Sequence, residues 1–109
     1  MNGNTTPAPL QAFVDAINSA DTDAFVAAFT ADGFVDDWGR VLNGPDGLRS
    51  WAATDAIGAG AHMTVLGTTV DGDEIEVRFG WKSRVFNGES TAIATVAGDR
   101  LRSFKILPG

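Results

Sequence analysis

Hydrophobic positions in the first third of the chain follow a helical period. Four of them stand at i, i+3, i+4 and i+7 close behind two prolines and predict a first amphipathic helix: Leu10, Phe13, Val14 and Ile17. Asp21 is a suitable N-cap for a second helix with a buried side at Phe25 and Phe29. Gly33 stands where the C-terminal glycine of that helix is expected. The pattern therefore predicts a helical hairpin.

A third helix follows two short extended pieces at 34–37 and 40–42. Pro45 marks its first turn, and its apolar positions include Leu48 and Trp51. The next member of the same i, i+3, i+4, i+7 series is Asp55. The spacing therefore places this carboxylate on the inward face of the helix.

From Met63 onward the period of the pattern changes to two. Four strands are predicted: Met63–Val70, Glu74–Val85, Ser90–Val96 and Arg100–Leu107. The dipeptides between them are hairpin-turn signals: Asp71-Gly72, Asn87-Gly88 and Gly98-Asp99. In the longest strand Phe79 and Trp81 lie on an apolar face, opposite a charged one. The second half of the chain is thus expected to form an antiparallel meander with one apolar face.

Helices followed by strands indicate an α+β layer arrangement. Residues 1–8 are expected to form a frayed N-terminus, and residues 9–107 a single domain of three N-terminal helices on a curved antiparallel sheet of about six strands. Because helices are wider than strands, a sheet that twists around them leaves a conical cavity at one end.

Composition and charge narrow the functions to consider. The net charge of −6 argues against nucleic acids and anionic membrane surfaces as partners, because both are bound through basic side chains. No apolar run is long enough to span a membrane, and no signal segment opens the chain, so a cytoplasmic location is expected. The chain has no cysteine, a single histidine and no glycine-rich phosphate loop, so neither a metal nor a cofactor is predicted.

Candidate chemistry gathers in and just after the stretch 33–55. Asp36 and Asp37 are adjacent, and because side chains alternate along a strand, only one of the two is expected to point inward. Asp55 either shares a cavity with Asp37 or is solvated, and two carboxylates in one cavity suit general acid–base work. Arg40 either neutralises these carboxylates, anchors an anionic ligand or forms a surface ion pair. His62, the only side chain that titrates near neutral pH, is a further candidate in an exposed setting.

The front of the chain resembles a known superfamily. The segment FVDAINSADTDAFVAAFTADGFVDDWGR and the helix start GPDGLRSW are similar to the SnoaL-like and ketosteroid-isomerase-like branch of the nuclear transport factor 2-like superfamily. The resemblance covers about residues 9–107 and implies a cone-shaped fold, a pocket for a small hydrophobic molecule and a homodimer. In ketosteroid isomerases an aspartate just after the acidic strand is the general base, and Asp37 matches that position.

This chain lacks two groups that ketosteroid isomerases use to stabilise the oxyanion. The isomerase oxyanion hole needs a tyrosine on the first helix, where this chain has Phe13, and a protonated aspartate on the later strands, where 92–95 contains no acid. Steroid isomerisation is therefore disfavoured. SnoaL-like aldol cyclases use an acid/base aspartate, a role that Asp37 or Asp55 can fill with His62 as partner.

Two functions stay open from the sequence. In the first, the protein is an isomerase or cyclase whose aspartate base acts on an apolar carbonyl substrate. Besides the catalytic candidates, the residues assigned to substrate binding are Phe13, Trp38, Arg40, Trp51, Phe79 and Trp81. The donor to the developing oxyanion is open among Thr91, Thr95 and the Trp81 N–H. In the second, the chain is a non-catalytic ligand-binding or dimerisation module whose pocket holds a metabolite or is filled by its own tryptophans.

Overall fold

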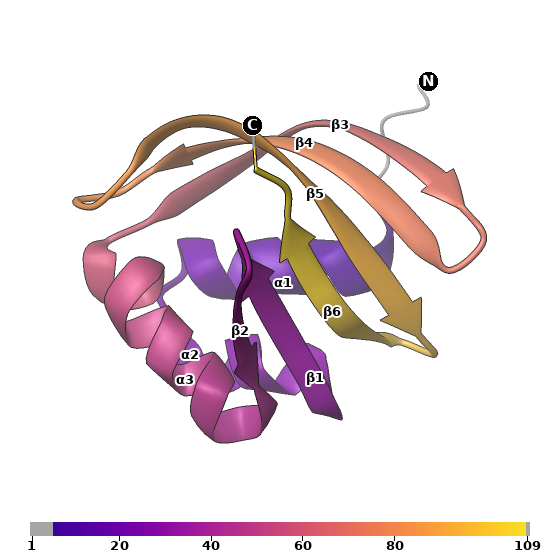
Figure 1. Cartoon of the computed structure of the whole chain (residues 1–109), viewed down its shortest axis with the longest axis horizontal. Helices are drawn as coiled ribbons and strands as arrows, with labels where there is room; N and C mark the ends of the chain where they lie inside the picture. Colours follow the sequence, from indigo (N-terminus) through magenta and orange to yellow (C-terminus); the bar gives the residue numbers. More distant parts are fainter. Residues whose placement is uncertain (1–5, 109) are drawn as a thin grey trace.

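Three helices pack on the concave side of a six-stranded sheet (Figure 1). The computed structural model describes residues 6–108. The three α-helices are α1 (Ala8–Asn18), α2 (Thr22–Ala27) and α3 (Gly44–Asp55), and the short 3₁₀ helix η1 (Ile57–Ala59) follows α3. The strands are β1 (Phe29–Asp37), β2 (Arg40–Asn43), β3 (His62–Asp71), β4 (Glu74–Lys82), β5 (Asn87–Ala97) and β6 (Arg100–Ile106). Within 6–108, no helix is long and apolar enough to cross a membrane.

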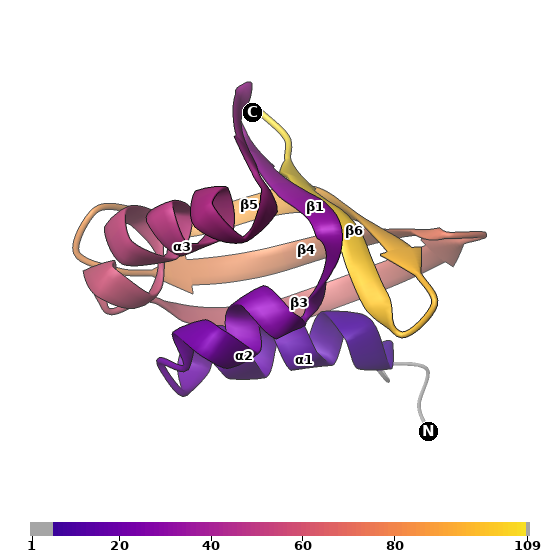
Figure 2. The ribbon, with the colours of Figure 1, turned by 90° about the horizontal axis from the view of Figure 1, so that it is seen from below.

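The first helix is the one that the hydrophobic spacing predicts. Its stripe is buried at Leu10, Phe13, Val14 and Ile17, and Figure 2 shows the helix beside β3. Of the expected frayed segment 1–8, residues 1–5 lie outside the described part of the chain, and α1 already begins at Ala8.

The second helix is shorter than predicted. Asp21 is its N-cap, and the carboxylate accepts a hydrogen bond from the Ala24 N–H at 3.0 Å. The helix nevertheless ends at Ala27, because Phe29 already begins β1 and pairs with Leu101 of β6. Gly33 is therefore a strand residue and not a helix C-terminus. It lies where the β1–β6 register shifts, and a Cβ at this position would stand only 2.8 Å from the Phe29 Cβ.

The sheet is mixed, with the order β2-β1-β6-β5-β4-β3. Neighbouring strands are antiparallel except β1 and β6, which run parallel, where the sequence pattern predicts an antiparallel sheet throughout. Turn signals determine only the direction of strands joined by a hairpin. β1 and β6 are joined through the rest of the chain, and a parallel pair requires such a long connection.

The loop between β4 and β5 also differs from the prediction. β4 ends at Lys82, so Val85 is not in a strand, and Asn87 and Gly88 pair with β4 and do not form the turn. The turn is the segment 83–86, which folds around the Ser83 hydroxyl: its Oγ accepts hydrogen bonds from the backbone N–H groups of residues 85 and 86. This local hydrogen bonding of a serine outweighs the Asn-Gly signal.

A dry aromatic cluster fills one end of the space between helices and sheet. It consists of Phe13, Phe25, Phe29 and Phe104, each at most 2% exposed. The Phe13 ring stacks on Phe104 with centroids 4.3 Å apart and meets Phe29 edge-on at 5.8 Å. Such packing fixes α1 and α2 against β1 and β6. The opposite end of the same space is not filled.

Candidate functional site

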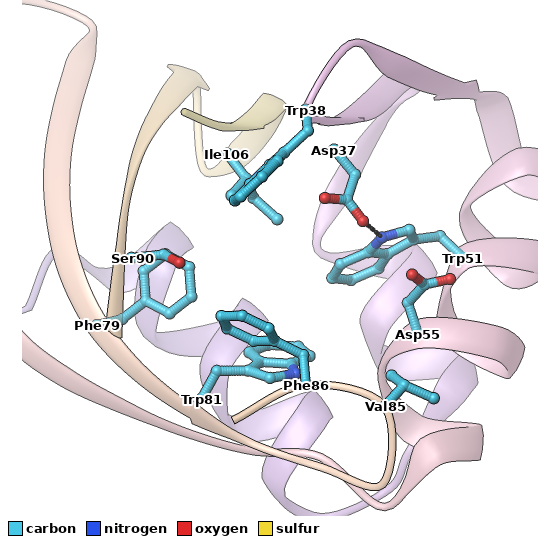
Figure 3. Close-up of a pocket in the computed structure, with 10 residues that line it drawn as sticks. All are labelled: Asp37, Trp38, Trp51, Asp55, Phe79, Trp81, Val85, Phe86, Ser90 and Ile106. Atoms are coloured by element: carbon cyan, nitrogen blue, oxygen red, sulfur yellow. Dashed lines mark hydrogen bonds between the residues drawn. The ribbon is translucent and has the colours of Figure 1, made fainter. Parts of the chain in front are cut away.

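A cavity of about 250 Å³ opens at the other end, between α3, the ends of β1 and β6, and the β4–β5 loop (Figure 3). Its lining is mostly apolar and aromatic, with two carboxylates. The residues are Asp37, Trp38, Trp51, Asp55, Phe79, Trp81, Val85, Phe86, Ser90 and Ile106. Aromatic walls with a few convergent polar groups are typical of a small-molecule site.

Asp37 is the carboxylate with a free oxygen in this cavity. Its Oδ2 accepts a hydrogen bond from the Trp51 indole Nε1–H at 3.0 Å and lies 3.4 Å from the Arg40 guanidinium. None of the described residues donates a hydrogen bond to Oδ1, and Figure 3 shows that oxygen on the cavity side. The side chain is 23% exposed. The arrangement fixes the direction of the carboxylate and leaves one oxygen for a ligand.

The neighbouring Asp36 lies on the other face of β1, as strand alternation requires. Its Oδ1 accepts a hydrogen bond from the Gly39 N–H at 2.8 Å. Asp36 therefore stabilises the β1–β2 turn. It makes no ion pair with Arg40, which instead contacts Asp37 and Asp55.

Asp55 also lines the cavity, and its carboxylate contacts the same guanidinium as Asp37, that of Arg40. The Arg40 guanidinium lies 2.8 Å from Asp55 Oδ2, and the other oxygen of Asp55 accepts the Thr54 hydroxyl. The hydrogen bond to Asp55 and the charges of both carboxylates raise the pKa of Arg40 above its usual value, against the effect of desolvation. The guanidinium is thus charged wherever the protein is folded. Arg40 links the β1–β2 turn to α3.

Trp38 covers the cavity from a strained position. Trp38 and Gly39 form the two-residue loop between β1 and β2, with φ of 56° and 92°. Positive φ at both positions marks a type I′ turn, which favours asparagine or glycine at the first position. Here that position holds a tryptophan, 58% exposed, whose ring points over the cavity (Figure 3). Strain of this kind is concentrated at functional sites.

The structure does not bring every predicted site residue together. Trp38, Trp51, Phe79 and Trp81 line the cavity with Asp37 and Asp55, and Arg40 lies at its edge. Phe13 is in the dry cluster at the other end. His62 is exposed at the start of β3, opposite Lys82, and does not line the cavity.

Four lining residues were not predicted, namely Val85, Phe86, Ser90 and Ile106. Val85 and Phe86 lie in the β4–β5 loop that the Asn-Gly signal misplaced. Ile106 comes into position through the parallel pairing of β1 with β6, where it stands opposite Asp37. Strand alternation is the signal that could have found Ser90, because it pairs with Phe79 on the same face.

Metal ligation has no support in the described residues. Within 6–108 there is no group of three His, Cys, Asp or Glu side chains that could hold a metal ion. The polar groups of the cavity are the two carboxylates, the Ser90 hydroxyl and the indole N–H groups.

Comparison with known proteins identifies the family. The sequence model of the SnoaL-like domain matches residues 10–106, and the chain belongs to this family. The predicted superfamily and the cone-shaped α+β fold of nuclear transport factor 2-like proteins are thereby confirmed. The search of curated proteins found no match.

Solved structures agree with this assignment. A candidate polyketide cyclase from Sinorhizobium meliloti is 30% identical, with a TM-score of 0.81 over 93% of this chain and 94% of that one. A Catenulispora acidiphila protein with a ketosteroid isomerase-like fold, solved with trimethylamine, is 22% identical, with a TM-score of 0.78 over 96% and 88%. SalBIII, an epoxide hydrolase/cyclase-like enzyme of pyran ring formation in salinomycin, is 16% identical, with a TM-score of 0.81 over 93% and 88%.

Proposed function

We propose that the protein is a small-molecule enzyme of the isomerase or cyclase type, in which Asp37 is the general acid/base for an apolar carbonyl substrate. The observation that carries the proposal is the Asp37 carboxylate itself: one oxygen is held by Trp51 and Arg40, and the other is free on the cavity side. A base must be positioned within hydrogen-bond reach of the proton that it takes. Similarity to a candidate polyketide cyclase and to an epoxide hydrolase/cyclase-like enzyme supports the reaction class.

The proposed step is proton abstraction from the carbon next to the carbonyl group. Asp37 Oδ1 takes the proton, the C–H electron pair moves into the new C=C bond, and the carbonyl oxygen becomes an enolate oxygen. The Ser90 hydroxyl and the Trp81 Nε1–H line the same cavity, and no described residue accepts a hydrogen bond from either. They are the donors available to that oxygen in place of the missing tyrosine and second acid.

Deuterium exchange tests this function. Small ketones and β-diketones are incubated with the protein in deuterium oxide, and exchange at the α-carbon is followed by NMR. Wild type is expected to accelerate exchange, and Asp37→Asn to lose the acceleration by at least about a hundredfold, the lower range for a general base. Asp36→Asn is the matched control, because its amide oxygen still accepts from Gly39. Equal rates for wild type and Asp37→Asn would contradict the proposal.

The non-catalytic module is the second candidate function. It is favoured by Phe13, which provides no hydroxyl and packs in the dry cluster, and by the ion pairs that already engage both carboxylates. In that case a small molecule binds and changes tryptophan fluorescence, but neither wild type nor Asp37→Asn accelerates exchange. The trimethylamine found with the Catenulispora acidiphila protein supports a small-molecule ligand for either candidate.

The homodimer implied by the resemblance is also part of the proposal. On the outer face of β4 and β5, Arg78 pairs with Glu89 at 3.3 Å, and Ile93 is half-buried. Sedimentation velocity is expected to give about twice the chain mass of 11.4 kDa. A species of single chain mass at micromolar concentration would contradict it.

A further inference from the structure

The walls of the cavity suggest the charge of its ligand. Five of its ten lining residues are aromatic, two are carboxylates, and none is lysine, arginine or histidine. We propose that this pocket takes an organic cation: an apolar molecule that carries an alkylammonium group. The inference rests on the proposed function only in taking this cavity as the ligand site, and it does not depend on catalysis.

Among the lining residues and their ion-pair partners, negative charges exceed positive charges by one. Asp37 and Asp55 contribute two carboxylates, and the one guanidinium that contacts them is Arg40. Arg40 is 55% exposed and lies at the outer edge of the pocket, so it compensates one of the two charges from the solvent side. Lining walls of low polarity strengthen the remaining field inside the cavity. A neutral or anionic ligand makes no use of this field, whereas a cation does.

The aromatic rings are arranged as the sides of a box. Trp51 and Trp81 have centroids 5.9 Å apart at an angle of 47°, and Phe79 meets Trp81 at 74°. Rings tilted in this way do not cover each other's faces completely. Figure 3 shows Trp38 on one side of the cavity, with Phe86 and Trp81 across from it. The negative faces of several rings around one space are the arrangement that attracts alkylammonium groups.

The free oxygen of Asp37 and the size of the cavity agree with this ligand. Asp37 Oδ1 accepts a hydrogen bond from no described residue. It can therefore contact a positively charged group of a ligand or take a proton from a neighbouring carbon atom. A volume of about 250 Å³ holds on the order of eight water molecules at ~30 Å³ each. That is room for a trimethylammonium group with a short chain.

A pair of isosteric probes tests the proposal. Choline and its neutral carbon isostere, 3,3-dimethylbutan-1-ol, have the same shape and differ in charge. Both are titrated into the protein at low ionic strength. All three tryptophans of the chain line the cavity, so their fluorescence reports directly on binding. Choline is expected to bind about five- to thirtyfold more tightly than the isostere, the range for a cation among desolvated rings.

Two variants test whether the carboxylates of the cavity cause the preference for choline. Asp55→Asn removes one carboxylate from the cavity and is expected to weaken choline binding several-fold while leaving the isostere unchanged. Asp99→Asn, in the β5–β6 turn at the far end of the sheet, changes the net charge equally and is expected to have no effect. Equal binding of the two probes, binding of neither, or an equal response to both variants would overturn the proposal. Those results leave the exchange experiment with Asp37→Asn unaffected, so the two proposals fail separately.

Discussion

The two ends of the space between helices and sheet are both aromatic, yet they differ in every other respect. The closed end, Phe13, Phe25, Phe29 and Phe104, is at most 2% exposed and holds no charged side chain. At the open end, lined by Trp38, Trp51, Phe79, Trp81 and Phe86, two carboxylates line the same cavity and Trp38 is 58% exposed. One core is thus closed by phenylalanines at one end and keeps an open cavity with two carboxylates at the other.

The two ends are nevertheless continuous. Trp51 stacks on Phe25 with centroids 5.8 Å apart, and Phe79 lies 5.9 Å from Phe104. The inner walls of the open end are therefore fixed by the closed end, whereas its outer walls, Trp38 and the β4–β5 loop, are fixed by turns. A site built on rigid elements keeps its geometry before a ligand arrives.

Phe13→Ala tests the closed end and has the largest expected effect. Phe13 contacts three other phenylalanines, so its removal leaves a void that the rings cannot fill. The free energy of unfolding is expected to fall by about 3–5 kcal/mol. Urea denaturation followed by circular dichroism measures it. A loss of less than about 1 kcal/mol would show that the cluster is not close-packed.

Trp51→Phe separates the two ends at the residue that they share. It keeps a ring against Phe25 but removes the Nε1–H group that donates a hydrogen bond to Asp37. We expect a loss of about 1–3 kcal/mol from the smaller ring and the lost hydrogen bond of a half-buried carboxylate. Trp81→Phe is the control, because no described residue accepts its N–H. An equal loss from both variants would argue against a stabilising role for the bond to Asp37.

Trp38→Asn tests whether the left-handed backbone conformation at Trp38, in the wall of the open end, is strained. Relief of a left-handed conformation at φ 56° gains about 1–2 kcal/mol, which offsets the contacts of a half-exposed ring. The stability of Trp38→Asn is expected to stay within about 1 kcal/mol of wild type. Trp38→Ala loses the ring without this relief and is expected to be less stable than Trp38→Asn in the same thermal melts. The reverse order would contradict strain at this turn.

Val85→Ala has the smallest expected effect. Val85 lies on the rim and is 62% exposed, so its truncation is expected to change the free energy of unfolding by less than about 0.5 kcal/mol. Val77→Ala, in the buried face of β4, removes two methyl groups from the core and is expected to cost about 1.5 kcal/mol. Similar values from chemical denaturation would mean that the rim is packed like the core.

The sequence predicts the parts of this molecule that depend on local spacing. Helical periodicity gives α1 and the inward position of Asp55, and strand alternation separates Asp36 from Asp37. It does not predict features that depend on contacts between distant segments. The parallel pairing of β1 with β6 brings Ile106 beside Asp37, and no turn signal records that pairing.

The same limit applies to the rim and to the charges of the site. The Ser83 hydroxyl folds the β4–β5 loop that carries Val85 and Phe86, and a single serine gives no pattern in a sequence. The contacts of Arg40 with Asp55 and Asp37 depend on the angle at which α3 packs against the β1–β2 turn. Sequence spacing leaves that angle undetermined, so the ion pair remained one of three alternatives.

The parallel pairing of β1 with β6 also determines when the site can form. Asp37 stands opposite Ile106 in that pair, so residues nearly seventy positions apart must meet before the cavity has two of its walls. The β1–β2, β3–β4 and β4–β5 pairs join strands that follow each other along the chain and do not depend on this contact. The pocket is therefore completed only after β6 has been synthesised, and a chain truncated before Arg100 lacks the wall that Ile106 provides beside Asp37.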